Sequence, residues 1–315
     1  MDVAALAERV LASDRGGVAR AISMVEDGAE GLAELSARLY PRTGNAYTIG
    51  LTGSPGVGKS SLAAELVRAA RSHELSVGVL AIDPTSPFTG GALLWDRLRM
   101  QAHATDPAVF IRSMATRGHL GGMALAAPEA IRILDASGKQ LVIVETVGVG
   151  QAEVEVANAT DTTLVVVSPG WGDAVQVAKA GILEIADVFV VNKADREGAA
   201  EAARDIQSML HMGPNLEWTP PVVRTSTVNG EGIDDLWDAI ESHRKHQEAT
   251  GRLARKRHGR LMAEVQGLAS QKMRERVRGA LEADPDLAAA LEERRTDPYR
   301  AADILLRTLT GAGSE

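Results

Sequence analysis

The chain has 315 residues, no cysteine and a formal net charge of −8. The lack of cysteine excludes disulfides and thiolate metal or iron–sulfur sites, and the negative charge argues against nucleic acid as the main partner. No apolar run approaches the length of a membrane span, about 20 residues. Acidic residues stand near the N-terminus, where a secretion signal would be basic. These features predict a cytoplasmic protein that binds no membrane.

The hydrophobic pattern divides the chain into three segments. Residues 1–44 have helical spacing and are predicted to form an N-terminal helical extension. Between residues 45 and 248 apolar strands alternate with helices, which predicts a doubly wound, mostly parallel α/β sheet with its ligand at the carboxyl ends of the strands. Residues 249–315 are predicted to form a C-terminal helical arm. Strands are expected at 47–52, 77–82, 109–112, 140–145, 162–167, 188–192 and 222–225. Helices of the sheet domain are expected at 60–72, 124–137, 173–186, 198–211 and 232–247.

The first predicted strand runs into the pattern Gly-x-x-x-x-Gly-Lys-Ser and then into a helix. This is the order of a phosphate-binding loop, whose backbone amides wrap nucleotide phosphates at the positive end of the helix. Glycine permits the close approaches that a Cβ would block. Lys59 is expected to reach the β- and γ-phosphates, and Ser60 to place its hydroxyl on magnesium. The residues predicted to bind the nucleotide here are Gly53, Ser54, Pro55, Gly56, Val57, Gly58, Lys59, Ser60 and Ser61.

Two carboxylates that could hold magnesium stand at the ends of further predicted strands. Asp83 follows the strand at 77–82, and Glu145 ends the strand at 140–145. Magnesium prefers oxygen ligands and usually keeps several waters, so both positions fit. Gly148 could lend its N–H to the γ-phosphate, which would make the segment after it respond to hydrolysis.

The residue after this glycine bears on the rate of hydrolysis. Many signalling GTPases have a water-orienting glutamine there, whereas this chain has Val149. A valine cannot orient water, so we predict slow intrinsic hydrolysis that another group or a partner accelerates, by about 10³–10⁵. Arg112, Arg117 and Lys179 are candidate cations for this role, and each is equally well interpreted as a surface residue.

The base is predicted by Asn192-Lys193-Ala194-Asp195, which directly follows an apolar strand. The carboxylate of Asp195 accepts hydrogen bonds from N1–H and the exocyclic amine of guanine, whereas adenine presents a lone pair at N1. A buried unpaired acceptor costs about 1–3 kcal/mol, so the segment favours GTP and GDP. A backbone N–H for guanine O6 is expected in the segment formed by Ser226, Thr227 and Val228.

The last segment is basic and amphipathic. Nine Lys/Arg stand against two Glu between Arg252 and Arg278, and Leu261, Val265 and Leu268 fall near one helical face. Three interpretations remain open: a membrane-surface or calmodulin-like helix, a helix folded onto its own domain, and an arm that packs on another subunit. We favour the last.

Five segments together closely resemble the GTPases that chaperone adenosylcobalamin-dependent methylmalonyl-CoA mutase: 51–61, 83–91, 112–121, 145–151 and 192–195. The resemblance implies a homodimeric GTPase that binds GTP/GDP and Mg²⁺, gates loading of adenosylcobalamin, and protects or rescues the mutase. It also implies that Asp83, Asp96 and Glu145 belong to the magnesium and switch region. Lys179 is implied to lie in a further switch that relays the nucleotide state to the mutase.

The chain departs from this family pattern at two positions of the further switch. Trp171 stands where a small residue is common, and Ala180 where a second lysine is frequent. Both departures concern stimulation by the partner rather than GTP binding.

Other clients and other classes of protein remain in view. Isobutyryl-CoA or ethylmalonyl-CoA mutase could replace methylmalonyl-CoA mutase. A nickel-delivery GTPase would be expected to show a His-rich tract or Cys/His ligands, and a signal-recognition GTPase a methionine-rich helical domain; the sequence has neither. A small-molecule kinase would need a base beside the γ-phosphate, a role that Asp83 could serve.

Overall fold

The computed structural model describes residues 2–83, 105–115, 122–146, 152–170, 182–212 and 217–310. The chain forms two compact units, Met1–Arg260 and Leu261–Glu315. The sequence predicts boundaries near residues 44 and 248. The structure instead groups the N-terminal helices with the sheet, because their apolar side chains share one core, and it places the boundary inside a long helix.

A seven-stranded parallel sheet with the order β3-β2-β4-β1-β5-β6-β7 organises the first unit. This confirms the predicted α/β fold and each of the predicted strands to within three residues at either end. The strands are β1 (Tyr47–Thr52), β2 (Val77–Asp83), β3 (Val109–Ala115), β4 (Leu141–Thr146), β5 (Thr162–Val167), β6 (Val188–Asn192) and β7 (Val222–Thr225).

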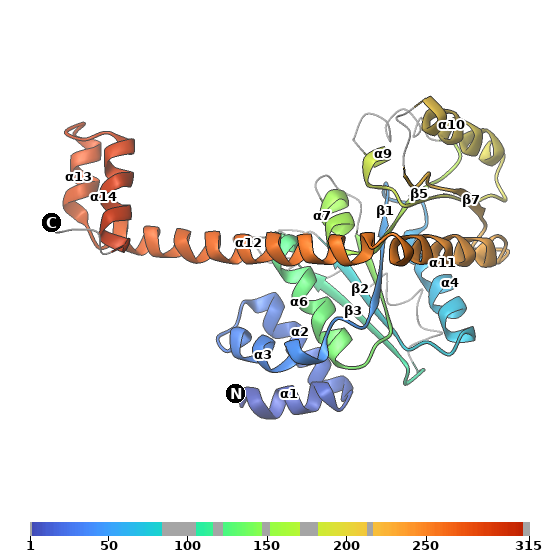
Figure 1. Cartoon of the computed structure of the whole chain (residues 1–315), viewed down its shortest axis with the longest axis horizontal. Coiled ribbons are helices and arrows are strands. Elements are labelled where there is room, and N and C mark those ends of the chain that lie inside the picture. The colour runs from blue at the N-terminus through green and yellow to red at the C-terminus, as the bar shows by residue number, and fades with distance from the viewer. Residues whose placement is uncertain are drawn as a thin grey trace. The chain divides into compact units, whose positions relative to one another are not determined.

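Helices cover both faces of this sheet (Figure 1). The N-terminal extension forms α1 (Val3–Leu11), α2 (Arg15–Asp27), α3 (Leu32–Leu39) and the 3₁₀ turn η1 (Tyr40–Arg42). The remaining helices of the first unit are α4 (Lys59–Ser72), α6 (Gly122–Ala136), α7 (Ala152–Ala159), α9 (Ile182–Ile185), α10 (Ala199–Met212), α11 (Ile233–Ala249) and the start of α12 (Arg252–Glu282).

The helix α7 is absent from the sequence prediction. Its residues, Ala-Glu-Val-Glu-Val-Ala-Asn-Ala, alternate polar and apolar side chains, a pattern with the period of a strand. The helix predicted at 173–186 is described only over Ile182–Ile185, because residues 171–181 lie outside the described part of the chain.

The strands β1, β4, β5 and β6 are buried along their whole length, as their continuous apolar runs predict, whereas β7 at the edge of the sheet is partly exposed. On one face α4 and α11 pack against β1, with Leu62, Leu66 and Leu236 fully buried. On the other face α6 packs together with α1–α3 over β2 and β4, where Ile22 and Leu35 are fully buried. The N-terminal helices thus complete the core that holds the strands in place.

The second unit contains the rest of α12 with α13 (Pro285–Glu292) and α14 (Pro298–Thr310). Its small core consists of Leu287, Ala301 and Leu305, with Val277 and Ala280 of α12 packed against them. Asp284 caps α13 by accepting a hydrogen bond of 3.0 Å from the Leu287 amide. Among the helices that the structure describes, none combines the length and apolar character needed to cross a membrane.

Candidate nucleotide-binding site

The glycine loop lies between the end of β1 and the start of α4, as predicted. Its backbone has φ angles of +136° at Gly53 and +100° at Gly58, a region that favours glycine. A Cβ at Gly53 would lie 2.1 Å from the Val166 carbonyl oxygen, and one at Gly58 would lie 2.4 Å from Nδ2 of Asn192. Both glycines are therefore required by close packing of the loop against β5 and β6.

Lys59 is folded onto this loop. Its side chain is buried, and Nζ donates hydrogen bonds to the carbonyl oxygens of Gly53 at 2.6 Å and Ser54 at 3.0 Å. An ammonium group held by loop carbonyls at the start of α4 is placed to exchange these partners for phosphate oxygens. The loop and the helix start thus bring together a cation and a positive helix end for a polyphosphate.

Ser60 and Glu145 meet at the carboxyl edge of the sheet. Ser60 Oγ donates a 2.6 Å hydrogen bond to Glu145 Oε1, and both residues are buried. They meet because β4 pairs with β1, with Leu51 opposite Glu145. The next strand, β2, places Ala81 opposite Glu145 and so ends at Asp83 on the same edge.

The donors at this edge suit a hard cation that is shared with a ligand. In the described residues no three His, Asp or Glu side chains converge as they do around a resident metal. A hydroxyl beside one buried carboxylate is instead typical of magnesium that takes its other ligands from phosphates and water. Ser60 and Glu145 therefore fit the predicted metal. The Asp83 side chain and Asp96 lie outside the described part of the structure.

The Asn-Lys-x-Asp segment begins at the end of β6 and bonds to the glycine loop. Asn192 is fully buried; its Nδ2 donates to the Val57 carbonyl oxygen at 2.9 Å, and its Oδ1 accepts from Thr225 Oγ1 at 3.2 Å. Lys193 Nζ donates to the Gly56 carbonyl oxygen at 2.6 Å. The segment predicted to bind the base and the loop predicted to bind the phosphates therefore form one site.

Asp195 is held by the segment that follows β7. Ser226 Oγ donates a hydrogen bond of 2.7 Å to Asp195 Oδ1. This bond, with one from the Asp195 backbone amide, lowers the pKa of the Asp195 carboxyl below its usual value, so the group is ionised at neutral pH. A carboxylate in this position can accept from two adjacent N–H groups of guanine.

The segment after β7 has one backbone amide already in use. The Ser226 N–H donates to the Glu231 carbonyl oxygen at 3.0 Å. The amides of Thr227 and Val228 are the remaining donors for guanine O6 in the predicted segment. The Val228 side chain is 84% exposed, so substitutions there can be made without disturbing the core.

One predicted cation has a different place. Arg112 Nη2 lies 2.6 Å from Glu26 Oε2 and 2.9 Å from Ser23 Oγ, both on α2. The Arg112 guanidinium therefore pairs with α2 and links the N-terminal helices to β3. We withdraw Arg112 as a candidate for assisting hydrolysis. Four other positions lie outside the described residues: Arg117, Gly148, Val149 and Lys179.

The fold and site together define the class of this protein. A parallel sheet with a phosphate loop after β1, bonded to an Asn-Lys-x-Asp segment after β6, is the arrangement of a P-loop GTPase. A family model described as methylmalonyl-CoA mutase-associated GTPase MeaB matches residues 18–282. The chain therefore belongs to the MeaB family of GTPases.

Individual relatives agree with this assignment. A protein of Pyrococcus abyssi described as a GTPase is 48% identical over 314 residues, covering 98% of this chain and 97% of its own. The GTPase ArgK of Escherichia coli is 38% identical over 254 residues, covering 78% and 77%. The crystal structure of a LAO/AO transport system kinase has a TM-score of 0.72 at 26% identity and covers 98% of this chain and 97% of that one.

Proposed function

We propose that this chain is a GTP-hydrolysing chaperone of methylmalonyl-CoA mutase that gates adenosylcobalamin loading and protects or reactivates the mutase. One observation carries the nucleotide part: Asn192 and Lys193 bond directly to the phosphate loop, with Asp195 beside them. Membership of the MeaB family supports the proposed partner, since the family's description names this mutase.

Preference for guanine follows from the ionised Asp195. Its carboxylate pairs with the two N–H groups on one edge of guanine, while adenine would leave an acceptor facing a lone pair. An acceptor left unpaired against a bound base is unfavourable, and more so when it is charged. This supports a GTPase over an ATP-dependent kinase.

The phosphates would be bound by the amides of residues 53–61 and by Lys59, which would leave the carbonyls of Gly53 and Ser54. We propose that Ser60, Asp83, Asp96 and Glu145 hold Mg²⁺, which when bound neutralises charge on the β- and γ-phosphates. The Ser60–Glu145 contact supports this set. Gly148 and Lys179 are proposed to sense and assist hydrolysis, which we expect to be slow without the mutase because of Val149.

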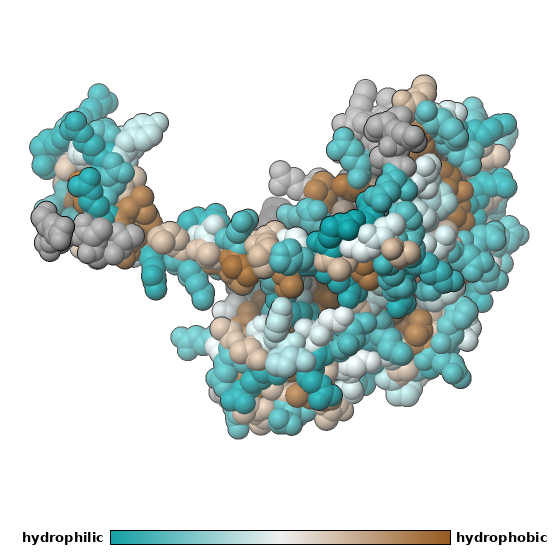
Figure 2. All heavy atoms as spheres, in the orientation of Figure 1, coloured by the Kyte–Doolittle hydropathy of each residue, from teal (hydrophilic) through white to brown (hydrophobic). Residues whose placement is uncertain are grey.

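The exposed face of α12 supports a homodimer. No residue of α12 is buried, and its apolar side chains are widely exposed: Met262 46%, Val265 59%, Leu268 42% and Met273 41%. Figure 2 shows apolar side chains at the surface of this helix. We propose that a second copy covers them, and that Val265→Asp shifts the sedimenting species from dimer to monomer.

The partner is tested by sedimentation of the chain mixed with methylmalonyl-CoA mutase, with GDP or with a non-hydrolysable GTP analogue. We expect a complex whose dissociation constant differs between the two nucleotides. The Asp195→Asn variant is the matched control, because its complex should lose the response to guanine nucleotides. A mutase that does not bind in either state would rule out this client, and isobutyryl-CoA or ethylmalonyl-CoA mutase would be tested in its place.

A further inference from the structure

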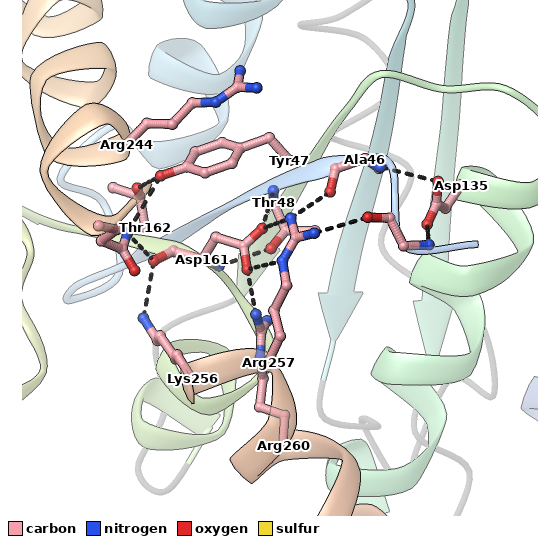
Figure 3. Close-up of polar contacts among 12 residues, drawn as sticks. Ala46, Tyr47, Thr48, Asp135, Asp161, Thr162, Arg244, Lys256, Arg257 and Arg260 are labelled. Atoms are coloured by element: carbon pink, nitrogen blue, oxygen red, sulfur yellow. Dashed lines mark hydrogen bonds and ion pairs between the residues drawn. The ribbon is translucent and has the colours of Figure 1, made fainter. Parts of the chain in front are cut away.

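A buried carboxylate joins the start of α12 to the sheet. It belongs neither to the phosphate loop nor to the Asn-Lys-x-Asp segment. Asp161 lies between α7 and β5 with a side chain 1% exposed. It accepts hydrogen bonds from Arg257 Nη2 at 2.6 Å and Nε at 3.1 Å, from the Thr48 amide at 3.0 Å, and from Arg260 Nη2 (Figure 3). We call Asp161, Arg257 and Arg260 the Asp161 clamp.

The clamp remains charged at neutral pH. Burial alone would raise the pKa of the Asp161 carboxyl, but the hydrogen bond from Arg257 and the charge of Arg260 lower it below its usual value. Two guanidinium groups and the Thr48 amide donate to this one buried carboxylate, and such charge-assisted hydrogen bonds are the stronger ones.

The two arginines reach different parts of the fold. Arg257 Nη1 and Nη2 donate to the carbonyl oxygens of Gly44 at 2.9 Å and Ala46 at 2.8 Å, just before β1. Arg260 Nη1 donates to the Ala159 carbonyl oxygen at 2.7 Å, at the last turn of α7. Arg260 therefore bonds α12 to α7, whereas Arg257 bonds it to the entry of β1.

The other end of α7 follows the segment proposed to contact the nucleotide. Five residues, 147–151, connect the end of β4 to Ala152, and Gly148 among them is the residue proposed to meet the γ-phosphate. The helix packs closely on β1: a Cβ at Gly50 would lie 2.5 Å from both Thr160 Oγ1 and Val156 Cγ1. The helix has eight residues, so about 12 Å of hydrogen-bonded backbone separates its first residue from its last carbonyl.

We propose that α7 and Arg260 transmit the nucleotide state to the first turns of α12. Arg260 is the positioning residue, because its fork holds Ala159 and Asp161 together. A γ-phosphate that displaces the start of α7 changes this bond, and with it the stability of residues 252–260. The inference rests on the proposed binding of GTP near Gly148. By linkage, whatever binds α12 then alters the ratio of GTP to GDP affinity by the same factor.

The test is hydrogen exchange of the backbone amides of residues 252–260 in the full chain, saturated with GDP or with a non-hydrolysable GTP analogue. We expect exchange rates that differ at least fivefold between the two states. Arg260→Gln should reduce the difference below twofold while both nucleotides still bind. Direct titration of both nucleotides comes first, so that a failure of GTP binding is distinguished from a failure of the coupling.

Two matched variants separate coupling from general loosening. Arg257→Gln removes the other guanidinium from Asp161 but leaves the bond to α7, and should keep the difference. Arg252→Gln removes a charge on the same helix that pairs with Glu217 at 3.2 Å, and should also keep it. If Arg260→Gln fails to fold, Arg260→Lys, which retains charge but cannot bridge both acceptors, should lower the difference. Equal exchange in the two states of the unmodified chain, or an undiminished difference in the folded Arg260 variant, would overturn the proposal.

Discussion

Ser60 Oγ and Glu145 Oε1 lie 2.6 Å apart, although 85 residues separate them in the chain. The contact joins the first turn of α4 to the tip of β4 and arises because β4 is the neighbour of β1 in the sheet. A hydroxyl and a buried carboxylate are thus brought together where the β- and γ-phosphates of a bound nucleotide would end. This contact is the observation that supports the proposed magnesium site.

Replacing Glu145 by Gln should raise the magnesium concentration that gives half-maximal GTP hydrolysis by tenfold or more. The amide keeps a hydrogen-bond acceptor for Ser60 but removes the charge that favours a cation. The measurement is hydrolysis titrated with MgCl₂, with nucleotide affinity in EDTA as the control, which should change little. An unaltered magnesium dependence would remove Glu145 from the metal site.

The substitution Asp195→Asn should weaken GTP binding by about tenfold or more, because guanine loses a charged acceptor. Xanthosine triphosphate should be affected much less, since its extra carbonyl accepts from the amide. Both affinities can be measured by titration calorimetry, with Ser226→Ala as a milder variant that removes only the support at 2.7 Å. Equal losses for the two nucleotides would show that Asp195 does not contact the base.

Gly58 and Gly44 form a matched pair, because both have φ of +100°. An added Cβ would meet Asn192 Nδ2 at 2.4 Å in the first case and no atom within 4 Å in the second. Each alanine variant bears backbone strain of about 1–3 kcal/mol. Only Gly58→Ala should also lose nucleotide binding, by at least 100-fold, as judged by titration with a fluorescent GDP. Similar nucleotide affinities in the two variants would contradict the close packing of loop and base segment.

The Asp161 clamp should make stability depend on pH in the acid range. The pKa of Asp161 is lowered in the folded chain, so its contribution is present above the unfolded value of about 3.9 and is lost as pH falls through the folded value. Asp161→Asn should cost about 3 kcal/mol at pH 7. Urea unfolding of both proteins from pH 7 to 3 should show this gap shrinking below about pH 4. A gap that stays constant across this range would argue against an ionised Asp161.

The sequence predicts the site well where the signal is local. The phosphate loop and the Asn-Lys-x-Asp segment are continuous motifs, and continuous apolar runs mark the strands that position them. Contacts between distant residues are different: nothing in the spacing shows that Arg257 and Arg260 meet Asp161, or that Arg112 pairs with Glu26. The helix α7 was not predicted, because the alternation of Glu and Val in its sequence has the period of a strand. The close approach of Val156 to Gly50 of β1 is a contact between distant residues, which the local pattern does not show.

The most direct test of the account is GTP hydrolysis by the purified chain, alone and with excess methylmalonyl-CoA mutase from the same cell. The account predicts slow hydrolysis alone and stimulation of tenfold or more by the mutase, about 1.4 kcal/mol of barrier. Hydrolysis that the mutase leaves unchanged would contradict the proposed partnership, and the absence of any GTP hydrolysis in either condition would contradict the proposed activity itself.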